Sequence, residues 1–337
     1  VSSRRQRQMC IRDRIKGPTI QEYDQEGVVA PYNIDSIAQS EGWDNLLDPM
    51  IAAIHKCENN SGPYCAAPVN IHRIDWMWAN KAVFDSNGIS VPTTWDELNA
   101  AADKLQAAGI IPFAHGGQAW QDATVFEAVA MGLGGNNYYK NCYVDLKESC
   151  LRSETTVKVF DQMRKLQSYT DEGSPGRDWN VATGMVIEGK AGFQIMGDWA
   201  KGEFTAAGKT PGVDYYCAAT PSNNGYLYNV DSFIFYKSSD PDKQAGQKLL
   251  AKLMMGKNFQ KVFNLYKGSI PARLDVSMDE FDKCAKTSNA DIKTAGAKGG
   301  LVPSFAHGMA QGNTMKAALQ DIITEHFNSD MSSVDAA

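Results

Sequence analysis

The sequence lacks any apolar run that could cross a membrane as a helix. Such a helix needs about 18 or more consecutive apolar residues, and no stretch of the 337 residues approaches that length. The sequence also lacks a nucleophile elbow (GxSxG), a phosphate-binding P-loop and a dinucleotide-binding GxGxxG fingerprint. These absences argue against a membrane-spanning protein and against enzymes that are built on those three motifs.

Metal-binding patterns are also scarce. No Cys-x-x-Cys pair occurs, and His55, the one histidine near the first two cysteines of the globular region, has no companion histidine beside it. Zinc sites combine several cysteine or histidine ligands at short spacings. We therefore expect neither a bound metal nor another cofactor.

The composition that remains is typical of a soluble globular protein, with 43% hydrophobic and 21% charged residues. The length suits two domains of ordinary size, each able to bury its own core. The sequence contains neither tandem repeats nor a low-complexity linker. The sequence therefore offers no flexible tether between two domains.

The first fourteen residues, VSSRRQRQMCIRDR, differ from the rest of the chain. They contain five arginines and almost no apolar pattern, and they resemble a translated sequencing adaptor. We therefore predict that residues 1–14 are a non-native artefact and exclude them from the fold. Without them the formal net charge moves from −6 to −10, and an acidic chain argues against nucleic acid or an anionic membrane surface as a partner.

The clearest local signal is a helix within the segment Pro92–Gly109. Thr94 and Glu97 have the spacing of a capping box, apolar side chains recur on one face, and Gly109 ends the helix. A short strand is predicted directly after it, at Ile110–Gly116. This alternation of helices and strands favours an α/β fold.

Two polar residues share one face of a strand predicted at Tyr226–Lys237. Asn229 and Asp231 are two residues apart, and side chains at that spacing point the same way. Burying both without partners would cost several kcal/mol, roughly 2–7 per group. They are therefore expected to meet a ligand or water, the alternative being the polar face of an edge strand.

A helix that ends at a lysine is predicted within Phe259–Arg273. Its apolar residues Val262, Phe263 and Leu265 are expected on the buried face, and a glycine follows Lys267. Lys267 would lie at the rim of whatever the helix packs against. The alternative is a lysine that only contacts the last carbonyls of its own helix.

Six blocks of the sequence, taken in order, resemble the glucose/mannose-type sugar-binding proteins of ABC importers, in the extracellular solute-binding protein family 1. The blocks are VNIHRIDWMWAN, FAHGGQAWQD, IMGDWA, YNVDSF, FQKVFNLYKGSIPAR and VPSFAHGMA. The similarity extends from about Ile15 to the C-terminus. Proteins of this family are periplasmic and close two lobes on a sugar.

The resemblance implies a two-lobe periplasmic-binding-protein fold of type II, in which strands cross the hinge. Strands predicted at Ala66–Asn80 and Tyr226–Lys237 would make the two crossings. The implied N-terminal lobe comprises residues 15–72 and 232–295, and the implied C-terminal lobe comprises residues 73–231 and 296–337.

The resemblance further implies that the chain is a fragment with an incomplete N-terminal lobe. Family members carry a first segment of about ninety residues, on the scale of a small domain, with the first strands of that lobe and a tryptophan-rich loop. No signal-peptide pattern is visible in the sequence. We expect this chain to bind sugar weakly or not at all and to expose an apolar sheet edge.

The sugar-binding residues follow from the resemblance and from the chemistry of sugars, whose C–H faces pack on aromatic rings and whose hydroxyls bond to charged groups. The candidates are Lys16, His72, Trp120, Asp198, Trp199, Asn229, Asp231, Lys267 and His307. Bland alternatives exist for several. Lys16 could be a solvated turn residue, His72 a structural histidine, Trp120 a packing residue and Asp198 the cap of the next helix.

Six cysteines outside the first fourteen residues are predicted to form three disulfides. Two pairs are eight residues apart across turn-forming segments, Cys57 with Cys65 and Cys142 with Cys150. Cys217 and Cys284 remain, and the resembling family has cysteines at both places. Disulfides fit an exported protein, whereas six reduced cysteines would fit a cytosolic one.

The function implied is capture of a monosaccharide, glucose or a related hexose, in a cleft between the lobes. The protein would be periplasmic and monomeric, would deliver the sugar to the permease subunits of an ABC importer, and would not be an enzyme. One alternative is a ligand-binding protein for chemotaxis, which uses the same fold. The other is a glycoside-acting enzyme, which would need two carboxylates facing each other across the bond.

Overall fold

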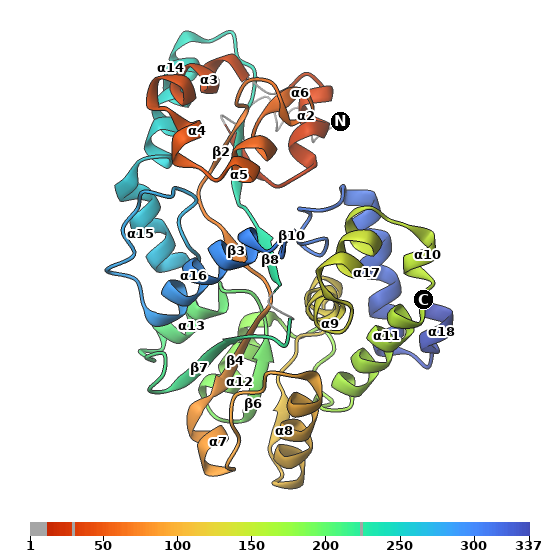
Figure 1. Cartoon of the computed structure of the whole chain (residues 1–337). Coiled ribbons are helices and arrows are strands. Elements are labelled where there is room, and N and C mark those ends of the chain that lie inside the picture. The colour runs from red at the N-terminus through yellow and green to blue at the C-terminus, as the bar shows by residue number, and fades with distance from the viewer. Residues whose placement is uncertain (1–11, 29–30, 223–224) are drawn as a thin grey trace. The chain divides into compact units, whose positions relative to one another are not determined.

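The computed structural model describes residues 12–28, 31–222 and 225–337 (Figure 1). The chain divides into two compact units, and each is described by itself. Unit 1 comprises Val1–His72, Asn229–Glu280 and Gly308–Asn313. Unit 2 comprises Arg73–Tyr228, Phe281–His307 and Thr314–Ala337.

Unit 1 is built on a three-stranded antiparallel sheet with the order β1-β9-β2. Its strands are β1 (Arg12–Ile15), β2 (Ala66–Pro68) and β9 (Ser232–Phe235). Its helices are α2 (Thr19–Gln25), α3 (Pro31–Glu41), α4 (Trp43–Leu46), α5 (Pro49–Ile54), α6 (Cys57–Asn60), α14 (Pro241–Met254) and α15 (Lys257–Lys267). Strand β1 begins at Arg12, so the fold includes the last three residues of the segment that we excluded as an artefact.

The core of unit 1 forms where β1, β9 and the helix α2 meet. Ile15, Ile20 and Ile234 are buried together with the disulfide between Cys57 and Cys65. Full burial of an aliphatic side chain contributes about 1.5–3 kcal/mol relative to exposure. This core therefore anchors the backbone on both sides of Lys16.

Unit 2 contains a four-stranded sheet with the order β5-β6-β4-β7. Strand β4 (Trp76–Asn80) is antiparallel to both β6 (Ala191–Ile195) and β7 (Tyr215–Ala219), and β5 (Ile111–Phe113) is parallel to β6. Trp76 and Trp78 are buried on this sheet. Both faces of β4 are covered, which explains its almost continuous run of apolar residues.

Three shorter strands form a second sheet with the order β10-β8-β3. They are β3 (His72–Arg73), β8 (Tyr226–Asn229) and β10 (Leu301–Pro303), and β10 runs parallel to β8. The chain changes from one unit to the other within β3 and within β8, the first two crossings of the partition.

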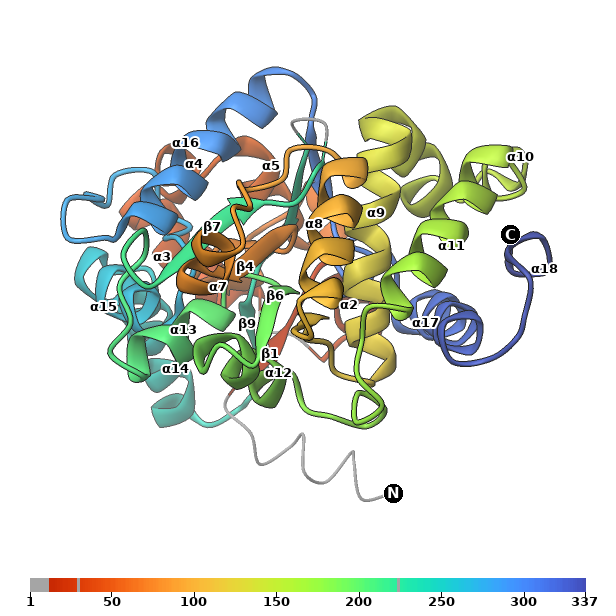
Figure 2. The same ribbon diagram turned by 90° about the horizontal axis from the view of Figure 1, so that it is seen from below.

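The helices of unit 2 cover its sheets, and α9 and α11 lie side by side (Figure 2). They are α7 (Lys81–Ser86), α8 (Trp95–Ala107), α9 (Ala119–Tyr139), the π-helix η1 (Lys140–Val144), α10 (Glu148–Leu151), α11 (Glu154–Gln167), α12 (Trp179–Ile187), α13 (Ala200–Ala206), α16 (Lys283–Ala297), α17 (Asn313–Asn328) and α18 (Ser333–Ala336). The capping box of Thr94 and Glu97 at the start of α8 is confirmed, and Gly109 has φ +74° just beyond its end. Among the described residues, no helix is long and apolar enough to span a membrane.

The two long strands that we predicted are each interrupted. The segment Ala66–Asn80 forms β2, β3 and β4, and the segment Tyr226–Lys237 forms β8 and β9. At the interruptions, the backbone N–H of Asp231 donates to Asn70 Oδ1 at 2.9 Å. There, side-chain hydrogen bonds replace part of the backbone hydrogen bonding between strands. Local sequence patterns do not reveal such bonds, because the two partners lie far apart in the sequence.

The prediction of an apolar buried face on α15 was wrong. Val262 is 41% exposed, whereas the buried residues of this helix are Gln260 and Asn264. Gln260 Nε2 donates to the carbonyl of Pro68 at 2.8 Å, and Asn264 Nδ2 donates to that of Val69 at 2.9 Å. The helix thus packs on the end of β2 and on the residue that follows it, through amides that satisfy backbone carbonyls.

The partition also differs from the implied lobes at Phe281–Ala295, which belongs to unit 2 rather than to the N-terminal lobe. Helix α16 is held there by the disulfide between Cys217 and Cys284 and by an ion pair of 2.9 Å between Lys201 Nζ and Asp282 Oδ2. Residues 229–231 and 308–313, which we assigned to the C-terminal lobe, lie in unit 1.

All three predicted cysteine pairs are joined as disulfides in the structure. Cys57 with Cys65 closes a loop of unit 1, and Cys142 with Cys150 and Cys217 with Cys284 lie in unit 2.

Candidate functional site

Asp231 is the centre of a polar cluster in unit 1. It lies between β8 and β9 and is 2% exposed. Its Oδ2 is 3.2 Å from His72 Nε2, and its Oδ1 is 3.5 Å from Lys16 Nζ. The structure therefore brings together three of the residues that the resemblance implied, from segments more than 150 positions apart in the sequence.

The charges around Asp231 keep it ionised. Burial by itself would raise its pKa, but the hydrogen bond and charge of His72, with Lys16 and Arg14, hold the pKa well below its usual range. Burial lowers the pKa of Lys16, as do Arg14 and Lys267, while Asp231 acts in the opposite direction. The cluster thus offers an anionic acceptor beside cationic donors.

Asn70 is a member of this cluster that the sequence analysis missed. Its Oδ1 accepts the backbone N–H of Asp231, and its Nδ2 donates to Asp231 Oδ2 at 3.1 Å and lies 2.9 Å from His72 Nε2. Asn70 is fully buried and holds the carboxylate and the imidazole in register. No local signal identifies it, because His72, Arg73 and Asp75 are further polar residues of the same segment.

Asn229 is buried, and the described residues offer its side-chain amide no hydrogen-bond partner. It is 1% exposed, and within the described part of the chain neither its Nδ2 nor its Oδ1 has a hydrogen-bond partner. Asp231 Oδ1 also makes no hydrogen bond there, although Lys16 lies nearby. Leaving a buried polar group unsatisfied costs about 1–3 kcal/mol, so these three atoms lower the stability of the ligand-free protein.

Lys267 lies at the end of α15, as the sequence predicted. The helix ends at Gly268, whose φ of 91° only glycine adopts without strain. Lys267 is partly buried, and its charge contributes to lowering the pKa of Lys16.

Unit 2 contains an aromatic cluster that is partly exposed. The ring of Trp199 is 6.3 Å from that of Trp120 and 5.0 Å from that of His307, measured between centroids. Trp120 lies in the first turn of α9, Trp199 is the N-cap of α13, and His307 follows β10. At Gly197 a Cβ would come within 2.2 Å of the Trp199 ring, so glycine is required for the ring to fold back there.

Asp198 is buried, whereas its neighbour Trp199 is partly exposed. It is 3% exposed, and its Oδ2 accepts the backbone N–H of Arg73 at 3.0 Å. The N-cap residue of α13 is Trp199, whose side chain makes no cap hydrogen bond. The Asp198 carboxylate fixes the backbone where β3 ends.

The predicted site residues therefore fall into two groups, one in each unit. Unit 1 contains Lys16, His72, Asn229, Asp231 and Lys267, and unit 2 contains Trp120, Asp198, Trp199 and His307. The described residues include no group of three or more histidine, cysteine, aspartate or glutamate side chains placed to hold a metal ion.

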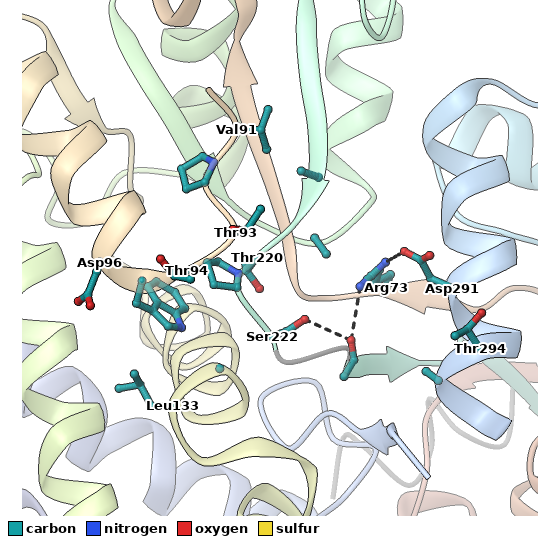
Figure 3. Close-up of a pocket in the computed structure, with 18 residues that line it drawn as sticks. Arg73, Val91, Thr93, Thr94, Asp96, Leu133, Thr220, Ser222, Asp291 and Thr294 are labelled. Carbon is teal, nitrogen blue, oxygen red and sulfur yellow. Dashed lines mark hydrogen bonds and ion pairs between the residues drawn. The ribbon is translucent and has the colours of Figure 1, made fainter. Parts of the chain in front are cut away.

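A pocket of about 600 Å³ lies within unit 2, apart from these groups (Figure 3). It is lined by the start of α8, the end of β7 and α16. Arg73 and Asp291 point toward one another on one side, with 2.5 Å between Nη1 and Oδ2 (Figure 3). The guanidinium also bonds to Asp75 and to the carbonyl of Gly225. Its donors are engaged within the chain, and we do not assign a ligand to this pocket.

Comparison with known proteins gives three consistent findings. The sequence pattern of the family described as bacterial extracellular solute-binding protein matches residues 14–254. A probable sugar-binding periplasmic protein of Brucella melitensis is 46% identical over 321 residues, which cover 95% of this chain and 75% of the relative. A protein of the same description from Rhizobium meliloti is 44% identical and is covered to 76% of its length.

Solved structures show the same fold at low sequence identity. The bacterial solute receptor AcbH, described as having an exclusive substrate preference for β-D-galactopyranose, matches with a TM-score of 0.81 and 20% identity over 97% of this chain and 81% of its own. Maltose-bound MalE3 of T. maritima matches with a TM-score of 0.74 and 18% identity over 96% of this chain and 81% of its own.

Proposed function

Because the chain belongs to the bacterial extracellular solute-binding proteins, we propose that it captures a monosaccharide, glucose or a related hexose, and delivers it to the permease of an ABC importer. At the coarser level it is a sugar-binding periplasmic component of an ABC transporter, and it is not an enzyme. The identity of the sugar and the residues that hold it are the content of the proposal.

One observation carries the proposal, namely the buried polar atoms of Asn229 and Asp231 that have no hydrogen-bond partner in the described part of the chain. An amide offers donors and acceptors, whereas a carboxylate only accepts. A sugar hydroxyl both donates and accepts, so one polyhydroxylated ligand satisfies both kinds of atom. A ligand of lower polarity would leave them unsatisfied.

The remaining candidates complete this chemistry. Lys16 and Lys267 supply ammonium donors, and hydrogen bonds to charged groups contribute about 1.5–3 kcal/mol each. In unit 2, Trp199 and Trp120 supply ring faces for the C–H groups of a pyranose. We propose that one sugar requires both the polar cluster and the aromatic cluster.

The test is isothermal titration of the purified protein, with the N-terminal segment that the family resemblance implies restored, against glucose, mannose, galactose, xylose and maltose. We expect tight binding of a hexose, weakened roughly tenfold or more by Asp231→Asn, because a charged acceptor is lost. Trp199→Ala should weaken it by a similar factor through lost ring contact. Asp242→Asn, an exposed carboxylate of the same unit, should leave affinity unchanged.

Absence of heat with every sugar would refute the proposed ligand class. Equal affinity of Asp231→Asn and the unaltered protein would refute the role of the polar cluster. Delivery to a permease further predicts that a strain lacking the gene loses high-affinity uptake of the sugar that the protein binds.

A further inference from the structure

The sequence block FAHGGQAWQD packs closely on the loop that precedes α12. At Gly116 a Cβ would come within 2.6 Å of the carbonyl oxygen of Arg177, and at Gly117 one would come within 2.4 Å of the Cα of Pro175. A parallel bridge also joins Gly117 to Pro175. The two glycines therefore let the backbone approach so closely that side chains at the start of α9 can bond to this loop.

Gln118 holds the indole of Trp120 by its edge. Trp120 Nε1 donates to Gln118 Oε1 at 2.7 Å. An indole has a single N–H and no acceptor, so this bond uses its whole capacity for hydrogen bonding. With that bond made, Trp120 offers a ligand its ring and no hydrogen-bonding group.

The amide of Gln118 is itself fixed at both ends. Its Nε2 donates to Asp178 Oδ1 at 2.7 Å, and its Oε1 accepts a second bond from Gln121 Nε2 at 3.1 Å. Gln121 is fully buried and also donates to the carbonyl of Arg177 at 3.0 Å. Because a carboxylate can only accept, the NH₂ end of Gln118 faces Asp178 and the carbonyl end faces Trp120.

The backbone that carries Trp120 is held as well. The carbonyl of Trp120 accepts the hydroxyl of Thr124 at 2.7 Å. Further along α9, the buried carboxyl of Glu127 accepts the hydroxyl of Ser304 at 2.6 Å and lies 3.0 Å from the hydroxyl of Tyr139. Bonds within unit 2 therefore fix both the helix and the edge of the indole.

Two aromatic rings lie beside Trp120, and neither is parallel to it. The planes of Trp199 and His307 are inclined to the Trp120 ring by 50° and 69°. Trp120 itself is partly exposed. A ring that is fixed in advance loses less conformational freedom when a ligand binds, which favours binding.

We propose that Gln118 is a positioning residue for sugar recognition, which holds the N–H of Trp120 so that this residue contacts the apolar face of the sugar through its ring alone. The proposal rests on the proposed function for the identity of the ligand. It adds a specificity, because Trp120 then distinguishes sugars by the shape of their C–H face and not by any single hydroxyl.

The first test needs no sugar. In ¹H–¹⁵N spectra, assigned with Trp120→Phe, the indole N–H of Trp120 should show a downfield shift and slow exchange with solvent. Gln118→Met has a similar length without the acceptor, so the signal should move upfield and exchange faster. An indole signal that is the same in Gln118→Met would overturn the inference.

A pair of exchanged side chains supplies the rescue. Gln118→Glu combined with Asp178→Asn keeps both bonds, with the donor and the acceptor exchanged between positions 118 and 178, and should restore the indole signal. Asp178 makes no side-chain cap bond to α12, so its replacement leaves the start of that helix unchanged. Failure of this rescue would contradict the bonding scheme.

The second test measures affinity for whichever of the five titrated sugars binds most tightly. Gln118→Met should weaken binding roughly two- to tenfold, the range of one hydrogen bond, and the exchanged pair should restore it. Gln106→Met, at an exposed glutamine of the same unit, is the matched control and should bind as the unaltered protein does. Unchanged affinity in Gln118→Met would overturn the positioning role.

Substitutions of Trp120 test recognition by the ring alone. Trp120→Phe, which keeps a ring without the N–H, should retain more affinity than Trp120→Ala. Adding Gln118→Met to Trp120→Phe should cause no further loss, because no N–H remains to be held, whereas a general structural role of Gln118 would give the same loss in both backgrounds. Equal affinities of Trp120→Phe and Trp120→Ala would overturn recognition through the ring.

The measurements separate this inference from the proposed function. If none of the five sugars binds the unaltered protein, the proposed function fails, and a role of Gln118 in sugar recognition fails with it. If a sugar binds and Gln118→Met changes neither the indole signal nor the affinity, the proposed function stands and this inference fails.

Discussion

Asn229 and Asn70 illustrate at the residue scale how one side-chain type serves two purposes. Both are buried asparagines within a few positions of the unit boundaries. Asn70 bonds through both amide atoms, whereas neither amide atom of Asn229 has a hydrogen-bond partner in the described chain. Asn70 therefore stabilises the folded protein, whereas the unsatisfied amide of Asn229 costs stability.

We therefore predict opposite effects of the same substitution at these two positions. Asn229→Leu removes unsatisfied polar atoms and should raise the free energy of unfolding of the sugar-free protein by about 1–3 kcal/mol, while abolishing sugar binding. Asn70→Leu should lower it by a similar amount. Urea unfolding and titration with sugar measure both, and destabilisation by Asn229→Leu would contradict the reading of Asn229 as a ligand-binding residue.

Glu127 makes a second prediction at this scale. Burial raises its pKa to about 8, opposed by its bonds to Ser304 and Tyr139, with a further raising effect from Asp75. The surroundings of Glu127 accommodate a neutral carboxyl. The protonated carboxyl can donate to the hydroxyl oxygen of Tyr139, and the Tyr139 hydroxyl can then donate to the carbonyl of Pro303. Glu127 is therefore protonated in the folded state at neutral pH and ionised in the unfolded state.

The sign of the pH dependence follows from this difference. A carboxyl whose folded-state pKa is raised stabilises fully below its unfolded pKa of about 4.5 and loses that effect as pH rises to about 8. The free energy of unfolding should fall by about 1.4 kcal/mol per pH unit from this group in that window. Urea unfolding across the window should show this slope in the difference between the unaltered protein and Glu127→Gln, and parallel profiles would contradict it.

At the scale of elements, disulfides and buried amides attach helices to sheets. Cys217 on β7 is joined to Cys284 on α16 across 67 positions of sequence, whereas the other two disulfides span 8 positions each. A cross-link that closes a longer loop removes more entropy from the unfolded chain. Helix α16 should therefore depend on its disulfide more than the short loops depend on theirs.

The corresponding prediction compares two pairs of substitutions. Replacing Cys217 and Cys284 by alanine should lower the free energy of unfolding by about 4 kcal/mol, and replacing Cys142 and Cys150 by about 2.5 kcal/mol, on the chain-entropy relation. Reversible urea unfolding of both variants measures the difference. Equal losses would show that loop length does not control the stability gained from these disulfides.

At the scale of the whole molecule, the chain passes between two units several times, and each unit holds its own set of candidate residues. Unit 1 supplies a charged polar cluster around Asp231, and unit 2 supplies aromatic rings around Trp199. The two kinds of side chain match the two chemistries that the proposed ligand class has, polar hydroxyls and apolar C–H faces.

Features that depend on near neighbours could be predicted from the sequence. The capping box of α8, the end of α15 at Gly268 and the two eight-residue disulfide loops are confirmed, because each involves residues within one or two turns of chain. The resemblance identified the family and most of the side chains that gather around Asp231 and Trp199.

Features that depend on distant partners could not be predicted from the sequence. Local pattern suggested that Val262 is buried, but Gln260 and Asn264 face the core because β2 presents carbonyls to them. Asn70 bonds to a residue 161 positions away, and Thr124 bonds to one 183 positions away. No local signal distinguishes these residues from ordinary polar side chains.

By itself the sequence determined the family, the α/β class, the positions of helices with strong end signals and the side chains available for binding, because these follow from short-range chemistry and from a matched pattern of motifs. Only the tertiary structure decided where the strands break, which face of α15 is buried, and which polar atoms are left unsatisfied. Those outcomes depend on which distant groups compete for the same hydrogen bonds, and that competition is settled only when the chain is folded.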